Sequence, residues 1–177
     1  LTSGKTVTVS LSTTESEGEG LVGFIGEGTR GRREATTRLL NQAFPKVRHL
    51  MDVVGTVTVR VPTADLLAAV SLVAERNTPL RMIIEDDHIA LEAATGDQAH
   101  ASEAIEAQVE VTGEEKSIQA AGFNPHYLLD ALGALDAPYA HFSFTAPGKP
   151  CLITGLATID GDQLFDYRHV IMLMRLP

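Results

Sequence analysis

Two stretches of the chain carry leucine and valine at helical spacing. One follows Pro62, and the other opens at Asn124-Pro125, where asparagine suits the residue before a helix and proline suits the first helical position. In both stretches the apolar residues recur at one face of a helix. They are Leu66, Leu67, Val70 and Val73 in the first and Leu128, Leu129, Leu132 and Leu135 in the second. Each position in the second set equals one in the first plus 62, which indicates an internal repeat.

Segments typical of strands surround both helices in the same order. An alternating apolar segment precedes each helix, at Val57, Val59 and Val61 and then at Ile118 and Ala120. Three segments follow each helix: 80–85, 89–94 and 103–111 in the first copy, and 140–145, 151–156 and 169–176 in the second. Tight turns are expected at Asp86-Asp87 and Pro147-Gly148. The pattern predicts an α+β domain over residues 53–177 with duplicated β-α-β-β-β units, in which two helices pack side by side on antiparallel sheets.

Residues 1–50 lack a helical pattern. Three segments there, 6–11, 20–26 and 32–40, are typical of strands. Three strands bury little apolar area and are marginally stable alone. They match the last three strands of a further copy of the unit, without its first strand and helix. Phe44-Pro45 is typical of a connector, so we expect an incomplete domain at 1–43, a connector at 44–52 and a complete domain at 53–177.

Composition and charge narrow the classes of function. The 44% hydrophobic content is that of a globular protein, and the single Cys151 excludes an intrachain disulfide and fits a reducing, cytoplasmic setting. A net charge of -9 argues against a general nucleic-acid binder. Residues 30–49, however, hold six Lys or Arg against Glu34 alone, a balance of +5. Two interpretations remain open: a segment that lies near phosphate, or an ordinary solvated strand and loop.

Both ends of the chain are unusual. It begins at Leu1 without methionine, so we expect a fragment or a processed product. Its last nine residues, 169–177, are mostly large and apolar, but a bilayer span needs about 20 residues. We expect a terminal strand. Either that strand is buried on both faces, or its end offers methionine, leucine and arginine side chains to a partner.

Three groups of residues, in order along the chain, resemble the bacterial sliding clamp family, the beta subunit of DNA polymerase III. The first runs from Thr37-Arg38-Leu39-Leu40 to Ala43-Phe44-Pro45-Lys46. The second is Phe123-Asn124-Pro125-His126-Tyr127-Leu128-Leu129-Asp130-Ala131-Leu132, and the third is Val170-Ile171-Met172-Leu173-Met174-Arg175-Leu176-Pro177. The Phe-Asn-Pro helix opening and the Met-x-Met-Arg-Leu ending are together fairly specific for this family.

The resemblance implies a DNA-clamp fold of three similar domains per subunit, each made from two copies of the unit. Residues 1–43 would end the middle domain, and 53–177 would form the third. Two complete subunits would close as a homodimer into a ring around duplex DNA. The implied function is that of a processivity factor, a non-catalytic subunit without cofactors. It would tether the DNA polymerase III alpha subunit, the clamp loader and repair polymerases through their short linear motifs.

The family's partner site is a hydrophobic groove between the middle and third domains. Carried over by position, its residues here are Pro45, His49, Leu50, Tyr127, Pro150, Val170, Ile171, Met172, Leu173, Met174, Arg175 and Leu176. Methionines adapt to varied ligands, and Arg175 would bind carboxylate or carbonyl groups of a motif. The family commonly has proline at the position of Leu173, arginine at His49 and Leu-Pro at Met51-Asp52, so motif preference is expected to differ.

The resemblance also implies a ring interface at Leu72 and Val73. Helix residues that face the DNA should be mildly basic, and Arg76 and Arg81 are the candidates. The alternative for both arginines is an ordinary surface charge.

Two other classes of function remain open: a small α+β enzyme with a histidine/carboxylate site, and a structural self-assembly module. Asp86-Asp87 followed by His88 is the candidate catalytic cluster, although a hairpin turn is the favoured interpretation. The six histidines show no metal-ligand spacing, so we expect no metal site. Cys151 has no identifiable base nearby in sequence and is expected to be buried and inert.

Overall fold

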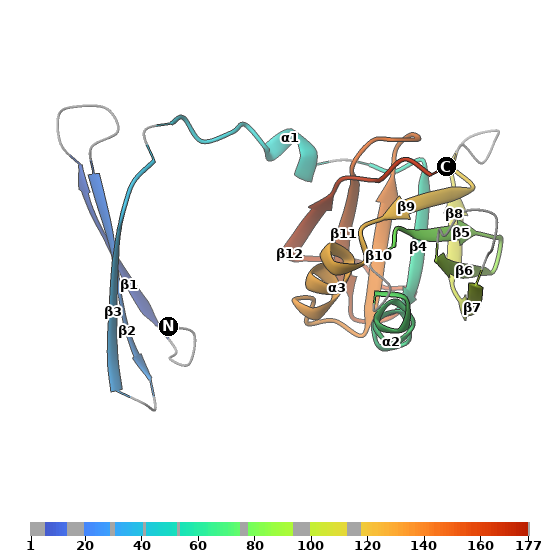
Figure 1. The fold of residues 1–177 in the computed structure, drawn as a ribbon, viewed down its shortest axis with the longest axis horizontal. Coiled ribbons are helices and arrows are strands. Elements are labelled where there is room, and N and C mark those ends of the chain that lie inside the picture. The colour runs from blue at the N-terminus through green and yellow to red at the C-terminus, as the bar shows by residue number, and fades with distance from the viewer. Residues whose placement is uncertain are drawn as a thin grey trace. The chain divides into compact units, whose positions relative to one another are not determined.

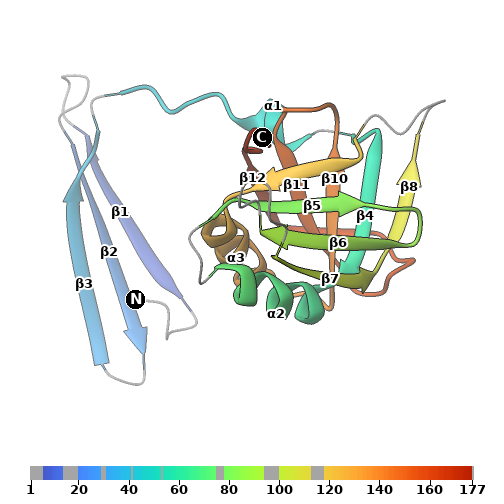
Figure 2. The same ribbon diagram turned by 45° about the vertical axis from the view of Figure 1, so that its right-hand side comes forward.

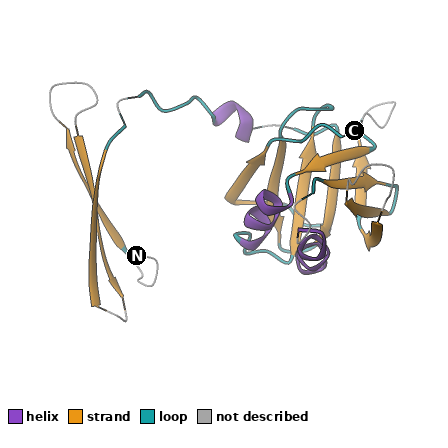
Figure 3. Ribbon diagram, viewed as in Figure 1, coloured by secondary structure: helices purple, strands orange, loops and turns teal. Residues whose placement is uncertain are grey.

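The computed structural model describes residues 6–13, 20–28, 31–40, 42–52, 54–74, 78–93, 100–112 and 118–176. The chain divides into two compact units, Leu1–Lys46 and Val47–Pro177, which are described separately. Figure 3 distinguishes their helices and strands by colour. Within the described ranges, no helix is long and apolar enough to span a membrane.

The first unit is a three-stranded antiparallel sheet. Its strands β1 (Val7–Thr13), β2 (Gly20–Gly28) and β3 (Gly31–Arg38) are adjacent in sequence order, as expected. Large apolar side chains on β1, such as Val9 and Leu11, are exposed. Within the described part of this unit only Gly26 is buried, so the sheet has no core of its own.

The described residues of the second unit form two antiparallel sheets and three helices, of which α2 and α3 exceed two turns. Its helices are α1 (Arg48–Met51), α2 (Thr63–Ala74) and α3 (Pro125–Gly133). The five-stranded sheet has the order β12 (Gln163–Ile171), β11 (Cys151–Leu156), β10 (Tyr139–Phe144), β4 (Val57–Pro62), β8 (Gln108–Val111). The four-stranded sheet has the order β7 (His100–Glu106), β6 (His88–Ala93), β5 (Leu80–Ile84), β9 (Ala120–Phe123). Helices α2 and α3 contact each other and lie side by side (Figures 1 and 2).

The strand pairing has the twofold pattern that the repeat predicts. The first strand of each copy joins the sheet of the other copy: β4 pairs with β10, and β9 pairs with β5. The remaining three strands of each copy follow as neighbours in both sheets. The duplicated β-α-β-β-β fold is therefore confirmed, and neither half can complete its sheet without the other.

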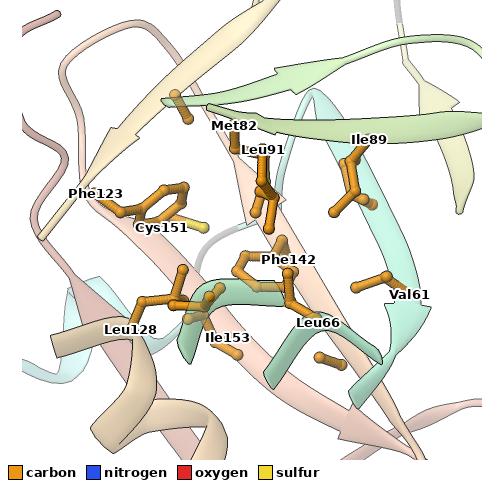
Figure 4. Close-up of a cluster of buried hydrophobic side chains, with 14 of the residues drawn as sticks. Val61, Leu66, Met82, Ile89, Leu91, Phe123, Leu128, Phe142, Cys151 and Ile153 are labelled. Carbon is orange, nitrogen blue, oxygen red and sulfur yellow. The ribbon is translucent and has the colours of Figure 1, made fainter. Parts of the chain in front are cut away.

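The core lies between the two sheets and the helices. Figure 4 shows side chains from β4, β5, β10 and β11 that converge with Leu66 of α2 and Leu128 of α3. Phe123 of β9 meets Phe142 of β10 edge to face, with ring centroids 6.2 Å apart. Helix α3 begins at its predicted cap, because the Asn124 side chain accepts from the backbone N–H groups of His126 and Tyr127.

Two predicted strands differ from those observed. The segment 103–111 is not one strand: β7 ends at Glu106, Ala107 is buried, and β8 begins in the other sheet. The predicted terminal strand 169–176 is wrong at both ends, because β12 spans Gln163–Ile171. Ile171 pairs with Cys151, the first residue of β11, so residues beyond 171 have no further partner on that strand.

Candidate functional site

The last residues of the described chain leave β12 and cross to the other sheet; we call residues 172–176 the tail. The backbone N–H of Met174 donates to the carbonyl of Gly122 over 2.8 Å and forms an isolated antiparallel bridge to β9. In the first copy, β8 pairs with β4 in the same manner, with Val111 opposite Val57. Both copies therefore end by returning to their own first strand, and the tail is the shorter of the two returns.

Side chains from Ile171 to Met174 alternate between the core and solvent. Ile171 is 3% exposed and belongs to the core, and Leu173 packs against the core. Met172 and Met174 are 63% and 39% exposed. The interpretation of this segment as a strand buried on both faces is therefore wrong. Among the predicted groove residues of this segment only Ile171 is buried, so we leave it out of the groove, whereas Leu173 is half-buried and stays in it.

Gly122 allows the tail to approach β9 closely. A Cβ atom at this position would lie 2.6 Å from the Met174 carbonyl oxygen and 3.0 Å from Leu176 Cδ2. A glycine within a short strand is typical of a site where another backbone approaches. This role was missed from the sequence, although Gly122 directly precedes the Phe-Asn-Pro segment.

Tyr127 is held near the same end of β9. It lies in the first turn of α3, which begins immediately after β9, and 61% of it is exposed. Beneath α3, Tyr167 Oη and His169 Nδ1 share a 3.0 Å hydrogen bond. Burial and then the Asp130 carboxylate raise the pKa of Tyr167, so its phenol stays protonated at neutral pH.

A second group of predicted groove residues lies on α1, β11 and β12. Helix α1 carries the exposed His49 and the half-buried Leu50, and it contacts β12 (Figure 1). Val170 of β12 is half-buried and pairs with Leu152 of β11, two residues after the half-buried Pro150.

Arg168 fixes α1 to β12. Its Nη1 donates to the carbonyl of Met51 over 3.2 Å and to Asp52 Oδ1 over 3.0 Å. The guanidinium carbon lies 4.5 Å from the centroid of the Phe165 ring. Because the partners are 116 residues apart along the chain, no local pattern indicated this ion pair.

The remaining predicted site residues are more dispersed. Pro45 belongs to the first unit and is exposed. Leu72 is exposed on α2, whereas the side chain of Val73 and the whole of Arg76 lie outside the described residues. Arg81 alternates with core residues of β5, so it faces away from the core and helices, and it pairs with Glu92 at 3.9 Å. We therefore no longer count Arg81 as a DNA-facing candidate.

The features behind the enzyme hypothesis gain no support. His88 Nδ1 lies 2.7 Å from Asp87 Oδ1 in an exposed turn, and this hydrogen bond is the main cause that lowers the pKa of Asp87. Cys151 is fully buried, and burial raises the pKa of its thiol far above neutral, so it is inert. No group of three or more potential metal ligands occurs among the residues that the structure describes.

Residues 42–175 match the family of the DNA polymerase III beta subunit, C-terminal domain. The chain belongs to the bacterial sliding clamp family. It is 42% identical over 179 residues to the beta sliding clamp of Streptomyces coelicolor. This aligned region covers 99% of this chain and 45% of that protein. A beta sliding clamp homologue of Streptomyces muensis is 34% identical over 148 residues, which cover 82% of this chain and 38% of that protein. The chain thus spans less than half the length of these relatives.

Solved clamp structures share the fold. The DNA polymerase III beta subunit of Thermotoga maritima superposes with a TM-score of 0.69 at 22% identity, over 97% of this chain and 42% of that one. A Caulobacter crescentus clamp with PEG bound to its beta-motif tethering region has a TM-score of 0.68 at 23% identity, over 94% and 41% of the two chains. A Pseudomonas aeruginosa clamp bound to griselimycin has a TM-score of 0.65 at 22% identity, over 89% and 42%.

Proposed function

We propose that this chain is the C-terminal part of a sliding clamp, a non-catalytic, cytoplasmic processivity factor. In the complete subunit, residues 1–43 end the middle domain, 44–52 connect, and 53–177 form the third domain. Two such subunits close as a homodimer around duplex DNA, with Leu72 and Val73 at the ring interface. Family membership and the duplicated fold support this proposal. Arg76 remains a candidate for contact with DNA phosphates.

The recruitment step is the docking of linear-motif peptides from the polymerase alpha subunit, the clamp loader and repair polymerases. One observation carries this part of the proposal: Met172 and Met174 are exposed on a fixed tail. The tail is fixed because Leu173 packs against the core and the Met174 backbone is bridged to Gly122. Flexible thioether side chains on a fixed backbone fit an apolar surface that accepts several sequences. In the second unit we propose that the groove comprises His49, Leu50, Tyr127, Pro150, Val170, Met172, Leu173, Met174, Arg175 and Leu176. The griselimycin and PEG complexes of related clamps support a binding surface on this fold.

Fluorescence anisotropy with a labelled clamp-binding peptide tests this function in a full-length subunit that contains the chain. We expect the double variant Met174→Ala/Leu176→Ala to weaken binding about tenfold or more, since two apolar contacts are lost. Val111→Ala is the control, because Val111 is a partly exposed apolar residue on β8 that lies outside the groove. Failure of the unaltered subunit to bind the peptide would contradict the groove.

A further inference from the structure

A cavity of about 290 Å³ opens on the five-stranded sheet. Its floor is the row Thr58, Ser143 and Leu152, which are register partners on β4, β10 and β11. These residues alternate with the core residues Val57 and Phe142, so the cavity lies on the sheet face away from the core. It is therefore a surface feature and not a packing defect of the core.

The accessible walls of the cavity are mainly apolar. Leu152 is buried at its base, and Phe165 and Val54 are exposed at its rim. The buried Oγ1 of Thr58 has no hydrogen-bond partner within the part of the chain that the structure describes. Because this oxygen is closed off from solvent, a ligand in the cavity does not reach it. The accessible lining of the cavity therefore favours an apolar group.

Arg168 holds one wall of the cavity in a fixed position through its contacts. The guanidinium holds Asp52 and the carbonyl of Met51, and it lies over the Phe165 ring. These contacts join the end of α1 to β12 on one side of the cavity. Phe165 is thereby held in place although 58% of it is exposed, which lowers the ordering cost of a contact made with its ring.

The cavity continues the proposed groove. Helix α1 carries Leu50 of the groove, and Met51 and Asp52 of the cavity follow directly. On the strands, Leu152 of the cavity is the register partner of Val170 of the groove. Val170 of the groove and Leu152 of the cavity are therefore neighbours on the outer face of the five-stranded sheet.

We propose that this cavity binds one large apolar side chain of a docked peptide, at a position outside the linear motif that occupies the groove. The inference rests on the proposed function. A volume of about 290 Å³ is at the lower limit of small-molecule sites and suits a single side chain with its backbone. Leu152, Phe165 and Val54 surround the side chain.

Competition anisotropy in the full-length subunit tests the proposal. The probes are a clamp-binding peptide, the same peptide with leucine added within three residues of either end of the motif, and matched peptides with serine at those positions. One leucine extension should bind about fivefold more tightly than its serine control. Phe165→Ala should abolish that gain and leave the unextended peptide unchanged. Val111→Ala at the opposite edge of the sheet is the control variant.

The outcomes separate the two proposals. If the unextended peptide binds but neither leucine extension gains affinity, or if Phe165→Ala leaves the gain intact, the cavity proposal is overturned and the groove stands. If no peptide binds the unaltered subunit, both proposals fail.

Discussion

At the scale of single residues, His141 shows how the outer face of the sheet is built. It points away from the core, yet only 2% of it is exposed, and Arg60 is its register partner on β4. Burial and then the Arg60 guanidinium lower the pKa of the imidazole to about 4. Ser143 Oγ lies 3.4 Å from Nδ1. The folded state therefore holds this histidine neutral under all but acidic conditions.

The buried histidine predicts a specific loss of stability in mild acid. In the unfolded chain the pKa of His141 returns to about 6.5. The contribution of neutral His141 to the free energy of unfolding is therefore complete above pH 6.5 and is lost as the pH falls toward 4. Between pH 7 and pH 5 the free energy of unfolding should fall by about 2 kcal/mol from this group alone. Urea titrations at both pH values should show that His141→Gln removes this part of the loss, whereas His126→Gln at an exposed position does not. An equal pH dependence in His141→Gln would refute the assignment.

At the scale of elements, the end of β12 decides what the tail presents. A strand continues only while a neighbour supplies hydrogen bonds, and β11 supplies none beyond the pair Cys151 and Ile171. The tail then bonds to β9, and the switch places Met172 and Met174 outward while Leu173 packs inward.

Gly122→Ala should displace the tail and leave the rest of the fold intact. The added methyl group would meet the Met174 carbonyl at 2.6 Å, and relieving that overlap costs about 1–3 kcal/mol. We expect faster hydrogen exchange at the Met174 amide and weaker binding of the motif peptide. Gly133→Ala is the matched control, because a Cβ there meets no atom within 4 Å. Unchanged exchange at Met174 in Gly122→Ala would show that the bridge does not depend on glycine.

At the scale of the whole molecule, the two units differ in what holds them together. All buried hydrophobic residues of the described chain lie between Val57 and Ile171. The second unit buries them among two sheets and two helices, whereas the sheet of the first unit leaves Val9 and Leu11 exposed. The free energy of folding therefore resides in the second unit.

Separate production of the two units tests this division. Residues 47–177 should unfold cooperatively, with a thermal midpoint within a few degrees of that of the 177-residue chain. Residues 1–46 alone should give a circular dichroism spectrum without stable strands, because three strands without a core are marginal. A cooperative transition in residues 1–46, or none in residues 47–177, would contradict the division.

Much of this architecture could be predicted from local periodicity. The helical spacing that begins at Leu66 and at Leu128 predicted both longer helices, α2 and α3. Asn124, as the predicted cap, marked the start of α3 correctly. The offset of 62 residues predicted the duplication, since equal patterns bury equal faces. The exposed methionines of the tail were also anticipated, but only through resemblance to a family.

Other features needed the tertiary structure, because they depend on partners that are distant along the chain. The pairing of β4 with β10 brings together residues about 80 apart, and the bond from Arg168 to Asp52 spans 116. Three further features depend on what the neighbouring strand provides. They are the division of the segment 103–111 into two strands, the end of β12 and the need for a small residue at Gly122. A pattern along one segment carries no information on the length of its neighbour, so the surface that we propose for docking is formed only when the two copies meet.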